Sequence, residues 1–279
     1  MIEKIGFMQG RLSPMIGGKI QSFPWDSWRH EIVAAKSIDI SIMEWTLDQE
    51  RLYENPIMTP SGQREIISLC NKHDFSIPSL TGDCFMQAPF WKTASDDRGG
   101  LIDDFIGVLD ACGSLDVQII VVPLVDNGAL TSKKEENYLI DILSDHEQSI
   151  ISNRVRIAFE SDFSPVALER FIDKLNPSLF GINYDIGNSA ALGFNVNEEF
   201  KSYGNRILNV HVKDRPLGGT TVPLGEGNAD FEAVFSKLSE CAYKGNYILQ
   251  TARDSSGQHS KVIKNYLDKT INWVSEYES

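Results

Sequence analysis

The chain has 279 residues, of which 42% are hydrophobic and 23% charged, as is ordinary for a soluble globular protein. Its 26 lysines and arginines against 39 aspartates and glutamates give a net charge of −13. That charge argues against a nucleic-acid partner and against docking on an anionic membrane, because both require a basic face. No apolar run approaches the roughly 18 residues that span a bilayer. With no recognisable export signal and four scattered cysteines, we expect a cytoplasmic protein.

Short β-branched runs alternate with longer amphipathic stretches along the chain. Several of the runs are apolar at nearly every position, as strands covered on both faces should be. The predicted strands are 4–12, 40–46, 76–82, 117–125, 155–161, 179–186, 207–213 and 246–251.

Helical patterns lie between these runs. Apolar residues recur at three- and four-residue spacing over 101–115, 231–238 and 262–274. Thr59–Pro60 and Ser164–Pro165 each read as an N-cap followed by proline at the first helical position. Ser132 with Glu135 reads as a capping box.

Strand and helix alternate about eight times over a length close to the ~250 residues of a (β/α)8 barrel. The pattern predicts an α/β fold, an eight-stranded parallel TIM barrel in a single domain over residues 1–279. A doubly wound open sheet is the alternative. It more often carries a glycine-rich phosphate turn after the first strand, and GFMQGRLSP lacks the GxGxxG spacing.

In a parallel barrel the active site gathers at the carboxyl ends of the strands, so the polar residues there are candidates. Glu160, Asp185, His211 and Gln250 end four consecutive predicted strands and should converge on one side of the mouth. Two carboxylates, an imidazole and an amide oxygen suit a divalent ion such as Mn²⁺, Mg²⁺ or Zn²⁺. A lone histidine in an apolar run is more often a core residue, but the neighbouring carboxylates favour a ligand. Other strand ends lead to Arg11, Glu44, Asp83, Asp126 and Lys213.

The segments IAFES, NYDIGNS, NVHVKDR, PLGEGNADF and YILQTAR together resemble the sugar phosphate isomerase/epimerase family, whose members have a xylose-isomerase-like barrel. The resemblance covers nearly the whole chain. It implies an enzyme that moves a proton next to a sugar carbonyl through an enediolate, with one divalent metal on a Glu, an Asp, a His and a second Glu. The matching positions are Glu160, Asp185, His211 and Gln250. The chain departs from the family at Gln250, usually glutamate, and at Asn188, often histidine.

The departure at Gln250 bears on mechanism. In similar enzymes two glutamates on opposite faces of the substrate exchange its proton, and an amide cannot do so. The missing charge should also weaken metal binding. We therefore expect an isomerase or epimerase with Glu160 as base and Lys213, Asp214 or Glu44 as the second proton carrier. A lyase that needs one base, or a sugar-binding barrel without chemistry, are the alternatives. A DNA-repair endonuclease of the same fold is disfavoured by the charge and by the small number of histidines.

Substrate contacts are expected from strand-end residues and early loops. The candidates are Arg11, Glu44, Asn188, Arg215 and Arg253, and with Lys213 the arginines would suit a sugar phosphate. The aromatic residues that follow the early strands could stack on a sugar ring or fill the core. The segment MQGRLSP…QSFPWDSWRHE is predicted to form a pocket wall, or alternatively a contact in a homodimer. In PLGEGNADF, two glycines should form tight turns, and Asn228 or Asp230 should cap the next helix.

Overall fold

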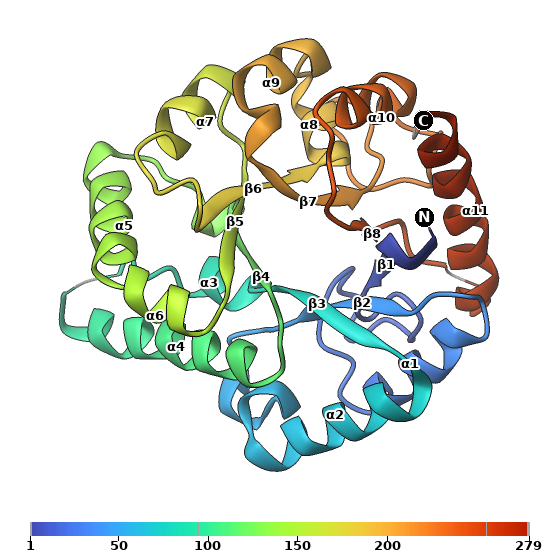
Figure 1. The fold of residues 1–279 in the computed structure, drawn as a ribbon, viewed down its shortest axis with the longest axis horizontal. Helices are drawn as coiled ribbons and strands as arrows, with labels where there is room; N and C mark the ends of the chain where they lie inside the picture. Colours follow the sequence, from blue (N-terminus) through green and yellow to red (C-terminus); the bar gives the residue numbers. More distant parts are fainter. Residues whose placement is uncertain (1, 94, 255, 278–279) are drawn as a thin grey trace.

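The fold is a closed barrel of parallel strands (Figure 1). The computed structural model describes residues 2–93, 95–254 and 256–277. Within these residues eight strands pair in chain order, and β8 returns to pair with β1, so the sheet closes. This confirms the TIM barrel and excludes the open sheet. The strands are β1 (Ile5–Met8), β2 (Ile42–Thr46), β3 (Ser76–Thr81), β4 (Ile119–Leu124), β5 (Arg156–Ser161), β6 (Phe180–Asp185), β7 (Ile207–Val212) and β8 (Tyr247–Leu249).

Helices form the outer ring around the strands (Figure 1). Among the described residues, none of these helices combines the length and the apolar character needed to cross a membrane. The helices are α1 (Trp28–Lys36), α2 (Pro60–His73), α3 (Asp83–Gln87), α4 (Ser95–Ser114), α5 (Lys133–Asp145), α6 (Glu147–Ser152), α7 (Pro165–Ile172), α8 (Ile186–Leu192), α9 (Val196–Tyr203), α10 (Phe231–Glu240) and α11 (His259–Tyr277). Short 3-10 turns cover Ile2–Lys4, Leu52–Glu54, Pro56–Met58, Asp126–Gly128 and Gly204–Arg206.

The strands are buried on both faces, as their apolar sequences predict. All six residues of β4 are buried. Ile119, Val121 and Ala158 form a separate small cluster, and Ala158 shares a strand face with Glu160, two residues further on. This cluster therefore lies deeper along the strands than Glu160, on the same face of β5. The deep interior of the barrel is apolar, and its polar groups concentrate toward the carboxyl ends of the strands.

Helix starts follow the predicted signals with two differences. Ser164 stands at the N-cap of α7, but its side chain makes no capping hydrogen bond. The hydroxyl of Thr59 accepts a hydrogen bond from the Gly62 amide, and Asp230 accepts one from Ala233, so both cap their helices. Ser132 likewise accepts from the Glu135 amide at 3.2 Å. The Glu135 carboxylate, however, accepts from the Thr131 amide at 2.7 Å, so it caps one residue earlier than a capping box requires.

The early aromatic residues fill the core and do not form a sugar platform. They pack on one another between strands and helices, for example Trp28 against Trp45 at 5.5 Å between ring centroids. None of them is among the described residues that line the pocket at the barrel mouth. Six aromatic residues follow the early strands. Five of them are buried, namely Trp28, Trp45, Phe85, Phe90 and Trp91, and the sixth, Trp25, is half-buried.

Candidate active site

A pocket of about 640 Å³ opens at the carboxyl ends of the strands. Glu160, Lys213 and Gln250 line it, with Asn188 and Arg215 beside them. The first loop contributes 19–21, which confirms that this segment forms part of the pocket wall. Residues from several strand ends thus meet at one cavity, as the barrel topology requires.

Glu160, Asp185 and His211 come together at this end of the barrel, and of the three only Glu160 is among the described residues that line the pocket. The register of β6 and β7 places Asp185 directly beside His211. Nδ1 of His211 lies 3.2 Å from Oε2 of Glu160 and 3.8 Å from Oδ2 of Asp185. One ligand atom from each residue lies within 4.8 Å of the other two, and all three residues are buried.

Gln250 is connected to this cluster by hydrogen bonds from Lys213. The ammonium of Lys213 donates hydrogen bonds to Oδ2 of Asp185 at 3.0 Å and to Oε1 of Gln250 at 3.2 Å. Burial alone would raise the pKa of Asp185, but the charge of Lys213 and the contact with His211 hold it well below its usual range. Two carboxylates and one imidazole nitrogen therefore lie close together, and the amide oxygen of Gln250 shares the Lys213 ammonium with one of these carboxylates. This donor set fits a divalent cation of hard or borderline character.

The Glu160 carboxylate is held by two asparagines. Nδ2 of Asn183 donates to Oε2 at 3.0 Å, and Nδ2 of Asn188 donates to Oε1 at 2.7 Å. Asn188 is oriented in turn by Arg215, whose Nη1 donates to its Oδ1 at 2.7 Å. Arg215 also donates to the Gly219 carbonyl. The amide at Asn188 thus fixes the direction of Glu160 toward the pocket.

Glu44 lies beneath His211 and away from the pocket wall. Nε2 of His211 is 2.7 Å from Oε1 of Glu44, and Asn209, Ser79 and Thr81 also donate to this carboxylate. Burial would raise the pKa of Glu44, but the imidazole and these hydrogen bonds lower it. Burial would lower the pKa of His211, and the charge of Glu44 raises it well above its usual value. The structure therefore places Glu44 where it orients the histidine, whereas the sequence predicted a substrate contact.

Two asparagines of this layer were missed by the sequence analysis. Asn183 and Asn209 each precede a ligand candidate by two positions, in Asn183–Asp185 and Asn209–His211, and the two pairs stand side by side in the register of β6 and β7. Nδ2 of Asn209 donates to Oδ1 of Asn183 at 2.9 Å. The signal was available, since a polar residue two positions before a strand-end ligand shares its face.

Arg11 and Arg253 are committed to backbone carbonyls. Arg11 donates to Thr251 and Ile20, both at 2.9 Å, and Arg253 donates to Ser13 at 2.6 Å. Burial, followed by repulsion from Arg253, lowers the pKa of Arg11 to about 9. Among the described residues, these two arginines are not part of the pocket lining. They tie the first loop to the end of β8, where the sequence predicted substrate contacts.

The carboxylate of Asp214 is also engaged in hydrogen bonds within the protein. The residue is fully buried, and its carboxylate accepts hydrogen bonds from the amides of Gly225, Gly227 and Ala229. Gly225 has a φ of +94°, which confirms the predicted tight turn. Asp214 organises the loop after β7, and its carboxylate is not directed at the pocket.

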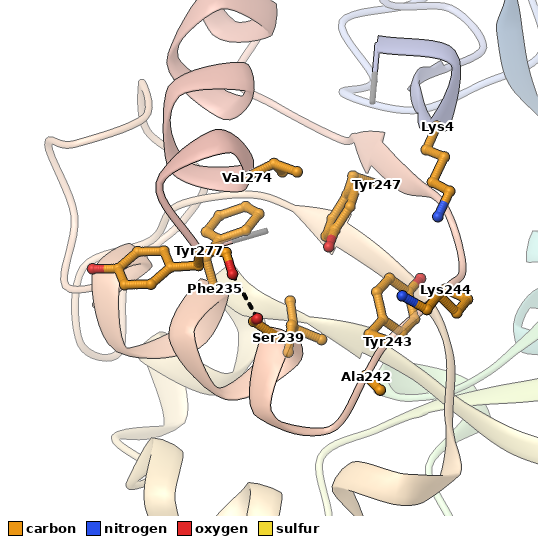
Figure 2. A pocket seen from close by; sticks show the side chains of 10 residues that line it. Lys4, Phe235, Ser239, Ala242, Tyr243, Lys244, Tyr247, Val274 and Tyr277 are labelled. Carbon is orange, nitrogen blue, oxygen red and sulfur yellow. Dashed lines mark hydrogen bonds between the residues drawn. The ribbon is translucent and has the colours of Figure 1, made fainter. Parts of the chain in front are cut away.

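A second pocket, of about 460 Å³, lies at the opposite end of the barrel (Figure 2). It is lined by Lys4 and Lys244 together with Tyr243, Tyr247 and other residues near the ends of α10 and α11. None of the described residues that line it is acidic. It therefore lacks the groups for metal binding or carboxylate proton transfer, and the mouth pocket is the candidate active site.

The fold is a TIM barrel whose candidate active site lies at the carboxyl ends of the strands. The model of the xylose isomerase-like TIM barrel family matches residues 32–276. The chain belongs to that family.

Individual relatives agree with this assignment. L-ribulose-5-phosphate 3-epimerase UlaE of Escherichia coli is 37% identical over 92 residues, which cover 31% of this chain and 32% of the relative. The match thus spans about a third of that protein's length. A structure of the IOLI protein with a bound zinc atom superposes with a TM-score of 0.77 at 16% identity, over 98% of this chain and 99% of that one. D-psicose 3-epimerase of Clostridium cellulolyticum H10 gives a TM-score of 0.74 at 10% identity, over 99% of each chain.

Proposed function

We propose that the protein is a metal-dependent isomerase or epimerase that moves a proton at the carbon next to the carbonyl of a sugar or sugar phosphate. The observation that carries this proposal is the cluster of Glu160, Asp185 and His211, of which Glu160 lines the pocket. It combines a carboxylate able to accept a proton with neighbours able to hold a cation. The sugar epimerases among the relatives agree with this chemistry.

Glu160, Asp185, His211 and Gln250 would hold the ion, which we expect to be Mn²⁺, Mg²⁺ or Zn²⁺. When bound, a divalent ion polarises the substrate carbonyl and so acidifies the adjacent C–H bond. These four residues include two carboxylates, whereas a site with a second glutamate has three. The site in this chain therefore supplies less negative charge to the ion. We therefore expect weak binding of the ion.

Glu160 would act as the base in this reaction. Its two hydrogen-bond donors, Asn183 and Asn188, hold the carboxylate in one orientation while leaving it at the pocket surface. Lys213 would face the oxygen on which negative charge develops, because its ammonium lies between Asp185 and Gln250. Asn188 and Arg215 would contact the substrate from the side of α8.

The substrate would be a ketose or its phosphate. Lys19, Lys213 and Arg215 are the cationic residues of the pocket lining, and they suit a phosphate group. UlaE is named for a pentulose 5-phosphate, which supports a substrate of that class. A cytoplasmic location and a homodimer stay predictions.

The test is solvent-deuterium incorporation. Purified protein is incubated in D₂O with Mn²⁺ and candidate ketoses or ketose phosphates, and the carbon next to the carbonyl is followed by NMR. We expect incorporation together with epimer or isomer formation, loss of both on chelation, and recovery on adding metal. Ligand-induced stabilisation without exchange would instead favour a sugar-binding barrel, and loss of water from the substrate would favour a lyase.

A further inference from the structure

Asp83 places a further carboxyl group on the wall of the mouth pocket. It is the first residue of α3, two positions after the last residue of β3, and only 7% of it is exposed. It lines the same cavity as Glu160, Lys213 and Gln250. The sequence placed it at a strand end without a role.

One side chain connects Asp83 to Gln250. Nε2 of Gln21, from the first loop, donates to Oδ2 of Asp83 at 2.8 Å. Oε1 of Gln21 accepts from Nε2 of Gln250 at 3.1 Å and from Arg11 at 3.4 Å. With two donors on its oxygen, Gln21 must turn its amide nitrogen toward Asp83. The amide at Gln250, which cannot carry a proton, is thus one side chain away from a carboxyl group that can.

The other candidate proton carriers are engaged or solvated. Glu44 lies under His211, and Asp214 accepts three backbone hydrogen bonds. Lys213 is paired with Asp185. Asp126 and Asp162 also line the pocket, but both are exposed, so water competes for them at the rim.

We propose that Asp83 is the second proton-transfer residue, which delivers a proton to the substrate face opposite the one that Glu160 serves. This inference rests on the proposed isomerase or epimerase function. It assigns to the end of β3 the acid–base work that the amide of Gln250 cannot perform.

The proposed reaction has two steps. Glu160 accepts the proton from the carbon next to the carbonyl; the C–H electron pair becomes the C=C bond of the enediolate, and the carbonyl oxygen takes the negative charge. The carboxyl O–H of Asp83 then breaks, its proton bonds to the opposite face of that carbon, and the carbonyl re-forms. Glu160 ends protonated and Asp83 ionised, and exchange with water at the pocket mouth resets both. The reverse reaction uses the two residues in exchanged roles.

The surroundings of Asp83 allow both protonation states near neutral pH. Burial, the hydrogen bond from Gln21, and the charges of Asp48, Glu160 and Arg11 act on it. Burial is the largest effect and, with the two carboxylates, outweighs Gln21 and Arg11, so its pKa is raised to about 7. A group with such a pKa can donate and accept protons at the pH of a cell.

The experiment uses each epimer of the pair in D₂O with Asp83→Asn and Glu160→Gln. We expect Asp83→Asn to lower epimerisation at least 100-fold. It should still exchange the proton of the one epimer whose C–H faces Glu160, within about tenfold of wild type. Glu160→Gln should instead exchange the proton of the other epimer, whose C–H faces Asp83. Asp83→Glu should recover part of the epimerisation. Asp26→Asn changes an exposed residue of the first loop and should behave as wild type.

Three outcomes would overturn the proposal. Asp83→Asn could epimerise within threefold of wild type. It could instead lose exchange of both epimers equally at an unchanged melting temperature, which would show no division of faces. Either result rejects Asp83 and leaves the proposed function standing, because wild type still exchanges. If wild type exchanged no proton with any ketose tested, both proposals would fall.

Discussion

The imidazole of His211 directly contacts the carboxylate of Glu44. Nε2 lies 2.7 Å from Oε1, and both side chains are 0% exposed. Because Nε2 is engaged by Glu44, the other ring nitrogen faces Glu160 and Asp185. A carboxylate behind a ligand histidine fixes the ring orientation and increases its basicity. Glu44 would thus support the proposed metal site even though it lies below the pocket.

Replacing Glu44 by glutamine should weaken metal binding. The variant removes the charge behind His211 while keeping the size of the side chain, and such partners typically contribute 10–100-fold in affinity. We expect a loss of that size, measured by competition with a coloured chelator. Ser79→Ala is the control, because it removes one donor to Glu44 and leaves the carboxylate. Equal affinity in wild type and Glu44→Gln would contradict this role.

Glu160→Gln should abolish turnover. The amide cannot accept the substrate proton, so we expect a loss of at least 100-fold in kcat in a coupled or NMR assay. Its NH₂ group would also meet the NH₂ of Asn183 or Asn188, so the melting temperature should fall by a few degrees. Glu198→Gln, an exposed residue of α9, controls for the change of charge. Turnover within tenfold of wild type would remove Glu160 from the role of base.

Gln250→Glu should strengthen metal binding. A carboxylate at this position adds a negative charge beside Asp185, and it retains the hydrogen bond from Lys213. It loses the donor to Gln21, so the link to Asp83 should weaken. We expect about tenfold tighter Mn²⁺ binding by calorimetry. Unchanged or weaker affinity would show that Gln250 does not face the ion.

The barrel and the clustering of three strand-end residues could be predicted because both depend on local pattern. Apolar runs define strands, and the ends of consecutive parallel strands must share one edge, which brought Glu160, Asp185 and His211 together. The roles of the arginines could not be predicted in this way. Arg11 has a long side chain whose direction is set by the carbonyl of Thr251, 240 residues away in sequence, and by that of Ile20.

The link from Asp83 to Gln250 could not be predicted for the same reason. It passes through Gln21, in a loop without regular periodicity, so no spacing in the sequence indicates it. In the sequence, Glu44 lies at the end of a predicted strand, just as the ligand candidates do. Only the packing of β2 against β7 across the barrel interior shows that it supports His211.

Asp83→Asn should change how stability depends on pH. The pKa of Asp83 is about 7 in the fold, against an ordinary value of 3.8 in the unfolded chain. Between these values the folded protein keeps a proton that the unfolded chain has lost, so this group's contribution to stability falls as pH rises through that window. Asp83→Asn has no carboxyl group at this position, so its stability does not fall in this way as pH rises. Its stability relative to wild type should therefore increase from pH 4 to pH 8, by at most about 4 kcal/mol.

Urea denaturation at pH 5 and pH 8 measures this difference. Glu31 also has a pKa raised to about 7 by burial, but it is present in both proteins and cancels. Asp26→Asn should show the same pH profile as wild type, since Asp26 is exposed. A constant difference between Asp83→Asn and wild type across this range would mean that Asp83 stays ionised.

The loop after β7 should tolerate no side chain at Gly227. A Cβ there would lie 2.1 Å from Oδ1 of Asp214, the carboxylate that binds three amides of the loop. Gly227→Ala must displace that carboxylate, and we expect a loss of about 2 kcal/mol or more in the free energy of unfolding. The kcat should fall as well, because the Arg215 carbonyl accepts from the Asn228 amide and the arginine moves with the loop.

Gly100→Ala is the matched control for Gly227→Ala. Gly100 lies in α4, and a Cβ added there would meet no atom within 4 Å. Alanine is the better helix former, so this variant should gain about 0.5–1 kcal/mol. Thermal and urea unfolding of the two variants should therefore differ from wild type in opposite directions. A Gly227→Ala protein as stable as wild type would show that Asp214 does not hold this loop as the hydrogen bonds indicate.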